Sequence, residues 1–136
     1  MTSTRVDRLA AIEMFKELDA SSLEALAGVC VPFEAPSGHN LIEPGLVAAG
    51  VFVFEEGTAL VEIHGHRLEV GPGEIVGEIA CLDRRALHTG RVHTTSEVRG
   101  VCFQRDDFMR LIETQPAISL LLLKIVASRF VDAAMS

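Results

Sequence analysis

The sequence predicts a mainly β domain with helices at both ends, its strands arranged as a sandwich or jelly-roll barrel. Three observations indicate this class. Apolar residues recur at helical spacing over about the first thirty positions, short β-rich runs punctuated by glycine and proline extend from Val31 to Phe103, and helical spacing returns from Asp106 onward. The 136 residues are expected to form one domain. Within residues 1–136 we expect helices over about 5–31, the strands over about 32–104 and helices over about 105–134.

The N-terminal segment is predicted to hold two helices. The first carries an apolar stripe at helical spacing, formed by Val6, Leu9, Ile12, Phe15 and Leu18. The stripe is interrupted at Asp19, and Ser21 with Glu24 then forms a capping-box pattern for a second helix. Neither helix carries a basic face, so the pair resembles a DNA-binding helix–turn–helix in shape only.

The central part is predicted to form short strands separated by turn residues. The β-rich runs cover residues 40–42, 51–55, 59–63, 67–70, 92–95 and 98–103. His64-Gly65-His66 lies between two of these runs and is predicted to be a hairpin turn. Many short strands at this spacing are typical of a sandwich or a jelly roll.

Two helices are predicted at the C-terminal end. Phe108, Leu111 and Ile112 belong to the first, which stops before Pro116. The second covers Ala117 to Ala133 and is apolar around more of its circumference than a surface helix should be. We expect the surplus apolar surface to be covered by the barrel, by a bound ligand or by a second subunit.

Composition excludes several classes of function. A net charge of −7 and a pI near 5.1 argue against a nucleic-acid surface, which needs a basic stripe. No apolar run is long enough for a membrane span, and no targeting segment is evident at the N-terminus. The three cysteines are widely spaced and form no CxxC pair, which is typical of reduced thiols in the cytoplasm.

The segment from Gly71 to Arg91 is the most informative one for function. It reads GPGEIVGEIACLDRRALHTGR and places Gly77 directly before Glu78 and a short apolar run. A helix that begins after a glycine presents unpaired N–H groups and a partial positive charge, which suit a phosphate. Cationic or titratable side chains follow within a few positions: Arg84, Arg85, His88, Arg91 and His93. In an acidic chain this concentration indicates a site for a small anionic ligand.

This segment resembles the phosphate-binding cassette of cyclic nucleotide-binding domains, the β-roll of catabolite activator proteins and of regulatory subunits of protein kinase A. The family pattern is G-E-[LI]-A-L-L, then a loop and R-[ST]-A; its opening is matched by Gly77, Glu78, Ile79, Ala80 and Leu82. Further matches in family order cover nearly the whole chain: Pro36–Gly38 with Leu41 and Ile42, Gly45, Val51–Phe54 with Gly57, Gly71–Gly73, and Val98–Phe108. The resemblance implies a cyclic nucleotide-binding β-roll, a jelly roll with N-terminal helices and a C-terminal helix.

The resemblance also implies which residues hold the ligand. Glu78 accepts a hydrogen bond from the ribose 2′-hydroxyl, although a carboxylate at a helix start can also simply cap free N–H groups. The phosphate lies on the turn that Gly77 opens, facing the backbone N–H groups of Ile79, Ala80 and Cys81. Thr89 matches the Ser/Thr position that contacts the phosphate.

One position departs from the family pattern. His88 stands where the family has the arginine that forks onto the phosphate, and Arg91 stands where a threonine is common. Losing one charge-assisted hydrogen bond is expected to lower the affinity about ten- to hundredfold. A protonated histidine can replace part of the arginine's contribution. Arg91 or Arg85 can supply the charge instead, and the remaining alternative is a pocket that has lost its ligand.

The sequence therefore favours a stand-alone regulatory module that binds cAMP or cGMP, with the C-terminal helix as a lid over the base. Regulators of the catabolite-activator type carry an added DNA-binding domain, and this sequence ends at Ser136 without one, so we do not expect it to work as such a transcription factor by itself. The alternative is a degenerate domain that binds no nucleotide and serves as a protein-interaction or homodimerisation module through its last helix.

An enzyme, a cofactor and a metal site are not expected. His64, His66 and Glu69 resemble part of a cupin metal site, but no suitable further ligand follows, and a solvated turn is the favoured interpretation. Cys81 lies near cationic groups, which can lower a thiol pKa, yet we expect it to be a small core residue. No nucleophile–base pair or acid–base carboxylate pair stands out, so no residue is predicted to be catalytic.

Overall fold

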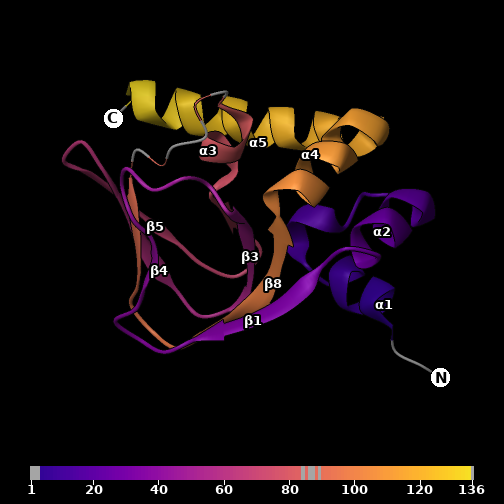
Figure 1. Cartoon of the computed structure of the whole chain (residues 1–136), viewed down its shortest axis with the longest axis horizontal. Coiled ribbons are helices and arrows are strands. Elements are labelled where there is room, and N and C mark those ends of the chain that lie inside the picture. The colour runs from indigo at the N-terminus through magenta and orange to yellow at the C-terminus, as the bar shows by residue number, and fades with distance from the viewer. Residues whose placement is uncertain (1–3, 84, 86–87, 89, 136) are drawn as a thin grey trace.

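The structure is a computed structural model that describes residues 4–83, 85, 88 and 90–135. Two four-stranded antiparallel sheets, in the orders β1-β8-β3-β6 and β2-β7-β4-β5, form a roll with helices at both chain ends (Figure 1). The strands are β1 (Val31–Ala35), β2 (Asn40–Ile42), β3 (Gly50–Glu56), β4 (Ala59–Ile63), β5 (His66–Val70), β6 (Ile75–Val76), β7 (Arg91–Thr94) and β8 (Val98–Gln104). The helices are α1 (Arg5–Ala10), η1 (Glu13–Phe15), α2 (Ala20–Ala27), α3 (Glu78–Leu82), α4 (Arg105–Thr114) and α5 (Pro116–Met135). The predicted mainly β class with flanking helices is confirmed.

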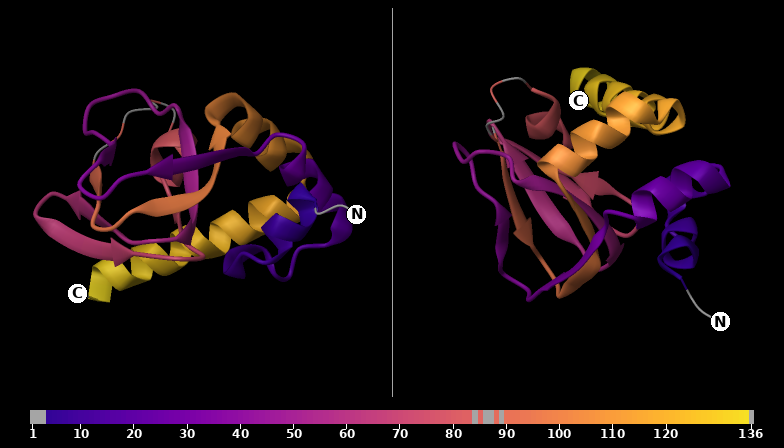
Figure 2. Two further views of the ribbon diagram at one scale, coloured as in Figure 1. Left: turned by 90° about the horizontal axis from the view of Figure 1, so that it is seen from below. Right: turned by 45° about the vertical axis from the view of Figure 1, so that its right-hand side comes forward.

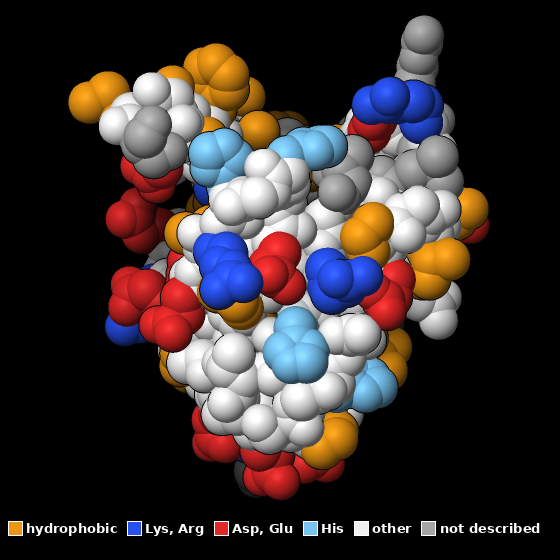
Figure 3. All heavy atoms as spheres, turned by 90° about the vertical axis from the view of Figure 1, so that its left-hand side faces the viewer, with side chains coloured by type: hydrophobic (Ala, Val, Ile, Leu, Met, Phe, Trp, Pro, Cys, Tyr) orange, Lys and Arg blue, Asp and Glu red, His pale blue; other side chains and the backbone are white. Residues whose placement is uncertain are grey.

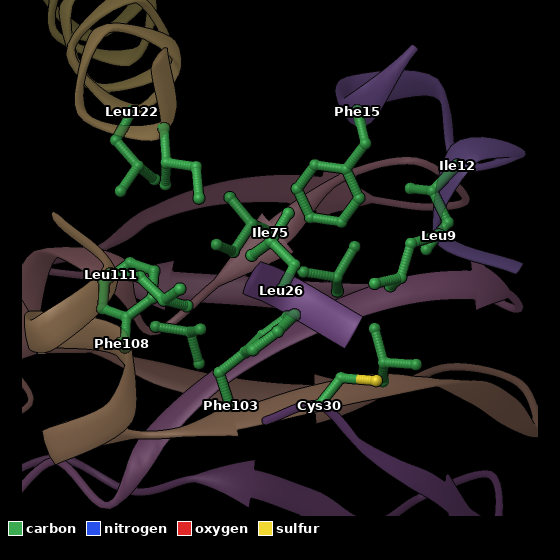
Figure 4. Close-up of a cluster of buried hydrophobic side chains, with 14 of the residues drawn as sticks. Leu9, Ile12, Phe15, Leu26, Cys30, Ile75, Phe103, Phe108, Leu111 and Leu122 are labelled. Carbon is green, nitrogen blue, oxygen red and sulfur yellow. The ribbon is translucent and has the colours of Figure 1, made fainter. Parts of the chain in front are cut away.

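Strand β3 lies at the centre of the packing because both of its faces are buried. Successive residues of a strand point to opposite faces. Val51 and Val53 therefore face the helices, while Phe54 faces the inside of the roll, where Phe52 also packs. We call the first cluster the helix-side core and the second the roll interior. Figure 4 shows the helix-side core, in which Phe103 of β8 lies among residues of α1, α2, α4 and α5.

The helices gather beside the β1-β8-β3-β6 sheet (Figure 2). Arg8 joins α1 to that sheet: its Nη2 donates to Oε1 of Glu55 at 2.6 Å and to the carbonyl of Gly100 at 3.2 Å. Arg5 donates to the carbonyls of Ala27 and Cys30, at and beyond the end of α2. In the described part of the chain, no such layer of helices covers the outer face of the opposite sheet, β2-β7-β4-β5 (Figure 1).

The N-terminal segment differs from the prediction in two respects. The apolar stripe does not lie on one continuous helix, because α1 ends at Ala10 and Glu13–Phe15 forms a short 3-10 turn. The predicted capping box that begins at Ser21 is also wrong. Helix α2 begins at Ala20, and the carboxylate of Asp19 accepts the N–H of Ser22 at 2.9 Å. Aspartate is as good an N-cap as serine, so the earlier residue in the chain takes the role.

Each of the predicted strands is present with ends that differ by no more than one residue, and two further strands appear. Strand β1 contains Pro32 and lies at the edge of its sheet, where a missing N–H is tolerated. Strand β6 has only two residues, too few to show a pattern. The hairpin between β4 and β5 is confirmed: His64 and Gly65 have φ of 48° and 82°, as a two-residue turn of type I′ requires.

The last helix crosses the mouth of the roll above α3 (Figure 1). It begins at Pro116, a favoured first position for proline, rather than at Ala117. Ile118 and Leu122 are buried in the helix-side core. Other large apolar side chains of α5 are exposed: Leu120, Leu123, Phe130, Val131 and Met135. In the described part of the chain, no helix combines the length and the hydropathy needed to cross a membrane.

Candidate functional site

A cavity of about 460 Å³ lies between the β2-β7-β4-β5 sheet, the start of α3 and the C-terminal part of α5. Its apolar wall consists of Ile42, Val61, Ile63, Leu68, Val76 and Val92. Its polar and charged residues are His64, His66, Arg67, Glu78, Arg129 and Asp132. Gly77, Ile79, Ala80, Gly90 and Ala133 complete the lining. A mostly apolar cavity of this size with a few convergent polar groups is typical of a small-molecule site.

Two glycines allow the cavity walls to approach each other closely. Gly77 has φ of 93° and precedes α3, and a Cβ there would lie 2.9 Å from the carbonyl oxygen of Gly50. A side chain at Gly90 would press against Ile63 and come within 2.9 Å of the Glu62 carbonyl oxygen. Position 77 therefore requires glycine, because left-handed backbone is strained for any residue with a Cβ and the Gly50 carbonyl leaves no room for that Cβ.

Glu78 is the buried acid of the site. It is 1% exposed, and a carboxylate so fully removed from water needs a charged partner. Arg129 of α5 is that partner: its Nη1 donates to Oε2 of Glu78, and its Nη2 donates to the carbonyl of Ile75. The C-terminal helix is thereby tied directly to the start of α3.

The structure brings together four of the predicted ligand residues. Gly77, Glu78, Ile79 and Ala80 all line the cavity. The Cys81 side chain lies instead in the helix-side core, 1% exposed, and its N–H donates to the carbonyl of Gly77 at 3.3 Å. Burial raises the pKa of the Cys81 thiol to about 11, so its thiol stays protonated at neutral pH.

Among the described residues, the predicted cations His88, Arg91 and Arg85 are not part of the cavity lining. His88 does not line the cavity; its N–H donates to the carbonyl of Leu46 at 3.0 Å, and burial lowers the pKa of its imidazole. The Nε of Arg91 donates to Glu43 at 2.8 Å, a contact that lowers the pKa of the Glu43 carboxyl. Arg85 pairs with Asp83 at 2.7 Å. Thr89 lies outside the described residues, so its predicted role remains a prediction.

Charges of both signs alternate on the outer face of the roll beside the cavity. Figure 3 shows basic side chains next to acidic ones there. The ion pairs Arg91–Glu43 and Arg67–Glu62 lie on or directly beside the strands of the β2-β7-β4-β5 sheet. Among the described residues, this face therefore offers no large basic patch. Within the described residues, no group of three or more His, Cys, Asp or Glu side chains could hold a metal ion.

Sequence reasoning missed two parts of the cavity. The first is Arg129, which lies at helical spacing after Ile118, Leu122 and Ile125 and so shares the inward face of α5. A cation on that face of an apolar helix was the available signal. The second is the β4–β5 hairpin, where His64 and His66 line the cavity even though both are exposed.

Comparisons of the sequence and of the structure with known proteins find relatives of this chain. The cyclic nucleotide-binding domain family matches residues 32–115. Acetyltransferase Pat of Mycolicibacterium smegmatis is 36% identical over 114 residues, which are 79% of this chain and 34% of that protein. A CRP-like cAMP-activated global transcriptional regulator of Mycobacterium tuberculosis is 27% identical over 130 residues, 89% of this chain and 56% of that protein. A solved structure of a cAMP-binding acyltransferase from Mycobacterium smegmatis superposes with a TM-score of 0.76 and 33% identity, covering 94% of this chain and 41% of that one.

The fold and the site together define a β-roll with a cavity between one of its sheets, α3 and the helix that crosses its mouth. More than half of the chain matches the family, so the chain belongs to the cyclic nucleotide-binding domain family. It spans only about a third and a little over half of the two curated relatives, respectively.

Proposed function

We propose that the cavity binds a cyclic purine nucleotide, cAMP or cGMP, and that α5 is the lid over the base. The observation that carries this proposal is the Gly77–Glu78 turn, which places a buried carboxylate and the first residues of α3 on the wall of a cavity of about 460 Å³. That volume lies within the usual range for small-molecule sites. The relatives named above as cAMP-activated and cAMP-binding support the choice of ligand.

Each part of the ligand has a place in this proposal. The phosphate lies on the Gly77–Leu82 turn, facing the N–H groups of Ile79 and Ala80, since the Cys81 N–H already donates to the Gly77 carbonyl. The ribose 2′-hydroxyl donates to Glu78, whose carboxylate has acceptor capacity beyond the one bond from Arg129. The base lies between the apolar wall and α5. Thr89, with His88 or Arg91, contributes to the anion site.

Recognition of the ribose gives the first test. Wild-type protein is expected to bind cAMP about ten- to hundredfold more tightly than 2′-deoxy-cAMP, because a hydrogen bond to a buried carboxylate is lost. Glu78→Ala is expected to remove most of that preference. Isothermal titration of both ligands measures it, and Asp132→Ala, which removes another carboxylate of the cavity, is the matched control. Undiminished preference in the Glu78→Ala variant would exclude the ribose contact.

The pH dependence of cAMP binding tests whether His88 contacts the phosphate. Burial lowers the pKa of His88 below its ordinary value of 6.5 in the protein alone, and a phosphate contact would raise it in the complex. Binding would then take up a proton, so the affinity increases as the pH falls through the interval between the two pKa values. We expect cAMP to bind several-fold more tightly at pH 6 than at pH 8. His88→Gln should flatten the profile; an unchanged profile in that variant would exclude His88 from the phosphate contact.

We propose a regulatory rather than a catalytic role for this chain. The match to Acetyltransferase Pat covers only 34% of that protein, so its activity is not carried over. A lid that is tied to the site by Arg129 can move between two packed positions when a ligand binds, which is the usual basis of a switch.

A second candidate function is a domain that binds no nucleotide and associates through α5. The observation in its favour is the exposed apolar surface of that helix, where Leu123 and Phe130 are 64% and 73% exposed. Size-exclusion chromatography with light scattering tests it: under this candidate the chain elutes as a dimer at micromolar concentration. A monomer that gives heat with cAMP supports the first function, and a dimer that gives none with cAMP or cGMP up to millimolar ligand supports the second.

A further inference from the structure

We infer that Arg129 of α5 binds the phosphate of the ligand and supplies the guanidinium that the sequence lacks at position 88. The inference rests on the proposed function, since it assigns a residue of the same cavity. Arg129 lines the cavity together with Gly77, Ile79 and Ala80, the residues that border the proposed phosphate position. It reaches this place from a helix that follows α3 by more than thirty residues in the sequence.

Two hydrogen bonds hold the Arg129 guanidinium in place and leave some of its N–H donors unused. Nη1 donates to Glu78 and Nη2 to the Ile75 carbonyl. A guanidinium carries five N–H donors, so these two bonds leave donors for an anion. Both partners belong to the segment that leads into and begins α3. The cation is therefore positioned beside the turn before any ligand contact is made.

The other described cations near the cavity are less suited to the task. Arg91 and Arg85 pair with carboxylates outside the cavity lining, and Arg67, which does line it, pairs with Glu62 and has a side chain that is 71% exposed. The Arg129 side chain is only 25% exposed. A charge that is largely withdrawn from water is screened less, so it attracts an anion more strongly.

The balance of charges in the cavity also favours a contact between Arg129 and the phosphate. Glu78 and Asp132 are carboxylates on its wall, and a cyclic phosphate adds another negative charge beside Glu78. Arg129 can bridge the Glu78 carboxylate and the phosphate, and this offsets the repulsion between them. Because Arg129 belongs to α5, the same contact makes the position of the lid sensitive to the ligand's phosphate.

Isothermal titration of cAMP at several salt concentrations tests the inference. Arg129→Gln keeps a hydrogen-bonding side chain beside Glu78 but removes the charge, and it is expected to weaken cAMP binding roughly ten- to hundredfold. It is also expected to reduce the salt dependence of the affinity, which a purely structural change would not alter. Arg129→Lys should retain part of the affinity. Lys124→Gln, an equal loss of charge at an exposed position of the same helix outside the cavity lining, should bind like the wild type.

The outcomes separate this inference from the proposed function. Wild-type binding with unchanged affinity and salt dependence in Arg129→Gln would overturn the inference alone. Tighter binding in that variant would also overturn it, since Arg129 would then compete with the ribose for Glu78. No binding of cAMP or cGMP by the wild type would overturn both. If Arg129→Gln does not fold, the double variant Glu78→Gln with Arg129→Gln, which leaves two neutral amides in contact, is compared with Glu78→Gln alone.

Discussion

Replacing Gly77 with alanine is expected to weaken the proposed nucleotide binding strongly and to destabilise the fold. The backbone at this position has φ of 93°, which costs a residue with a Cβ about 1–2 kcal/mol. The new Cβ would also lie 2.9 Å from the Gly50 carbonyl oxygen, a backbone atom of β3 that cannot move aside cheaply. Overpacking of this kind adds roughly 1–3 kcal/mol. Because the start of α3 must shift, we expect the cAMP affinity to fall about hundredfold or more.

Gly38→Ala is the matched control for this substitution. Gly38 has φ of 81°, nearly the same backbone strain, but a Cβ there would meet nothing within 4 Å. We expect only the strain cost and an unchanged cAMP affinity. Urea denaturation gives the free energies of unfolding, and isothermal titration gives the affinities. Equal losses of stability in the two variants would show that the contact with Gly50 contributes nothing.

Replacing Phe54 with alanine is expected to cost about 3–5 kcal/mol of unfolding free energy, the usual range for removing a buried phenylalanine. Phe54 is 0% exposed and packs in the roll interior, where its ring lies 6.1 Å from that of Phe33. A loss of this size is a large part of the total stability of a small domain, so the variant should unfold at much lower urea concentration.

The same substitution at Phe130 provides the comparison. Phe130 is 73% exposed on α5, so Phe130→Ala is expected to change the unfolding free energy by no more than about 0.5 kcal/mol. A loss comparable with that of Phe54→Ala, together with a melting temperature that rises with protein concentration, would show that a second copy of the chain covers this helix. That result would favour the dimerisation candidate.

Local patterns were sufficient for most of the fold. The strands around Val53 and Val101 follow from apolar runs bounded by turn residues, and the β4–β5 turn follows from a histidine and a glycine that both adopt positive φ. Strands β1 and β6 escaped prediction because a proline and a length of two residues leave no readable pattern. The capping box failed because Asp19 competes with Ser21 for the same role.

The site was predictable in part. The Gly77–Glu78 turn carries its own signature, since the glycine conformation and the helix start are local properties of neighbouring residues. The surrounding cations could not be placed in the same way. Arg91 and Arg85 lie close to this turn in the sequence, yet each pairs with a carboxylate outside the cavity lining, and only the folded arrangement decides which anion a long side chain meets.

By itself, the sequence determined the family, the β-roll and the glycine–glutamate turn, because these depend on spacing and backbone preference within short segments. Only the tertiary structure decided that the buried carboxylate of Glu78 meets Arg129, 51 residues away along the chain. The physical reason is that a carboxylate which is only 1% exposed needs a cationic partner, and the packing of α5 brings the Arg129 guanidinium into contact with it. The same packing ties α5 to the cavity wall through the Arg129–Glu78 ion pair.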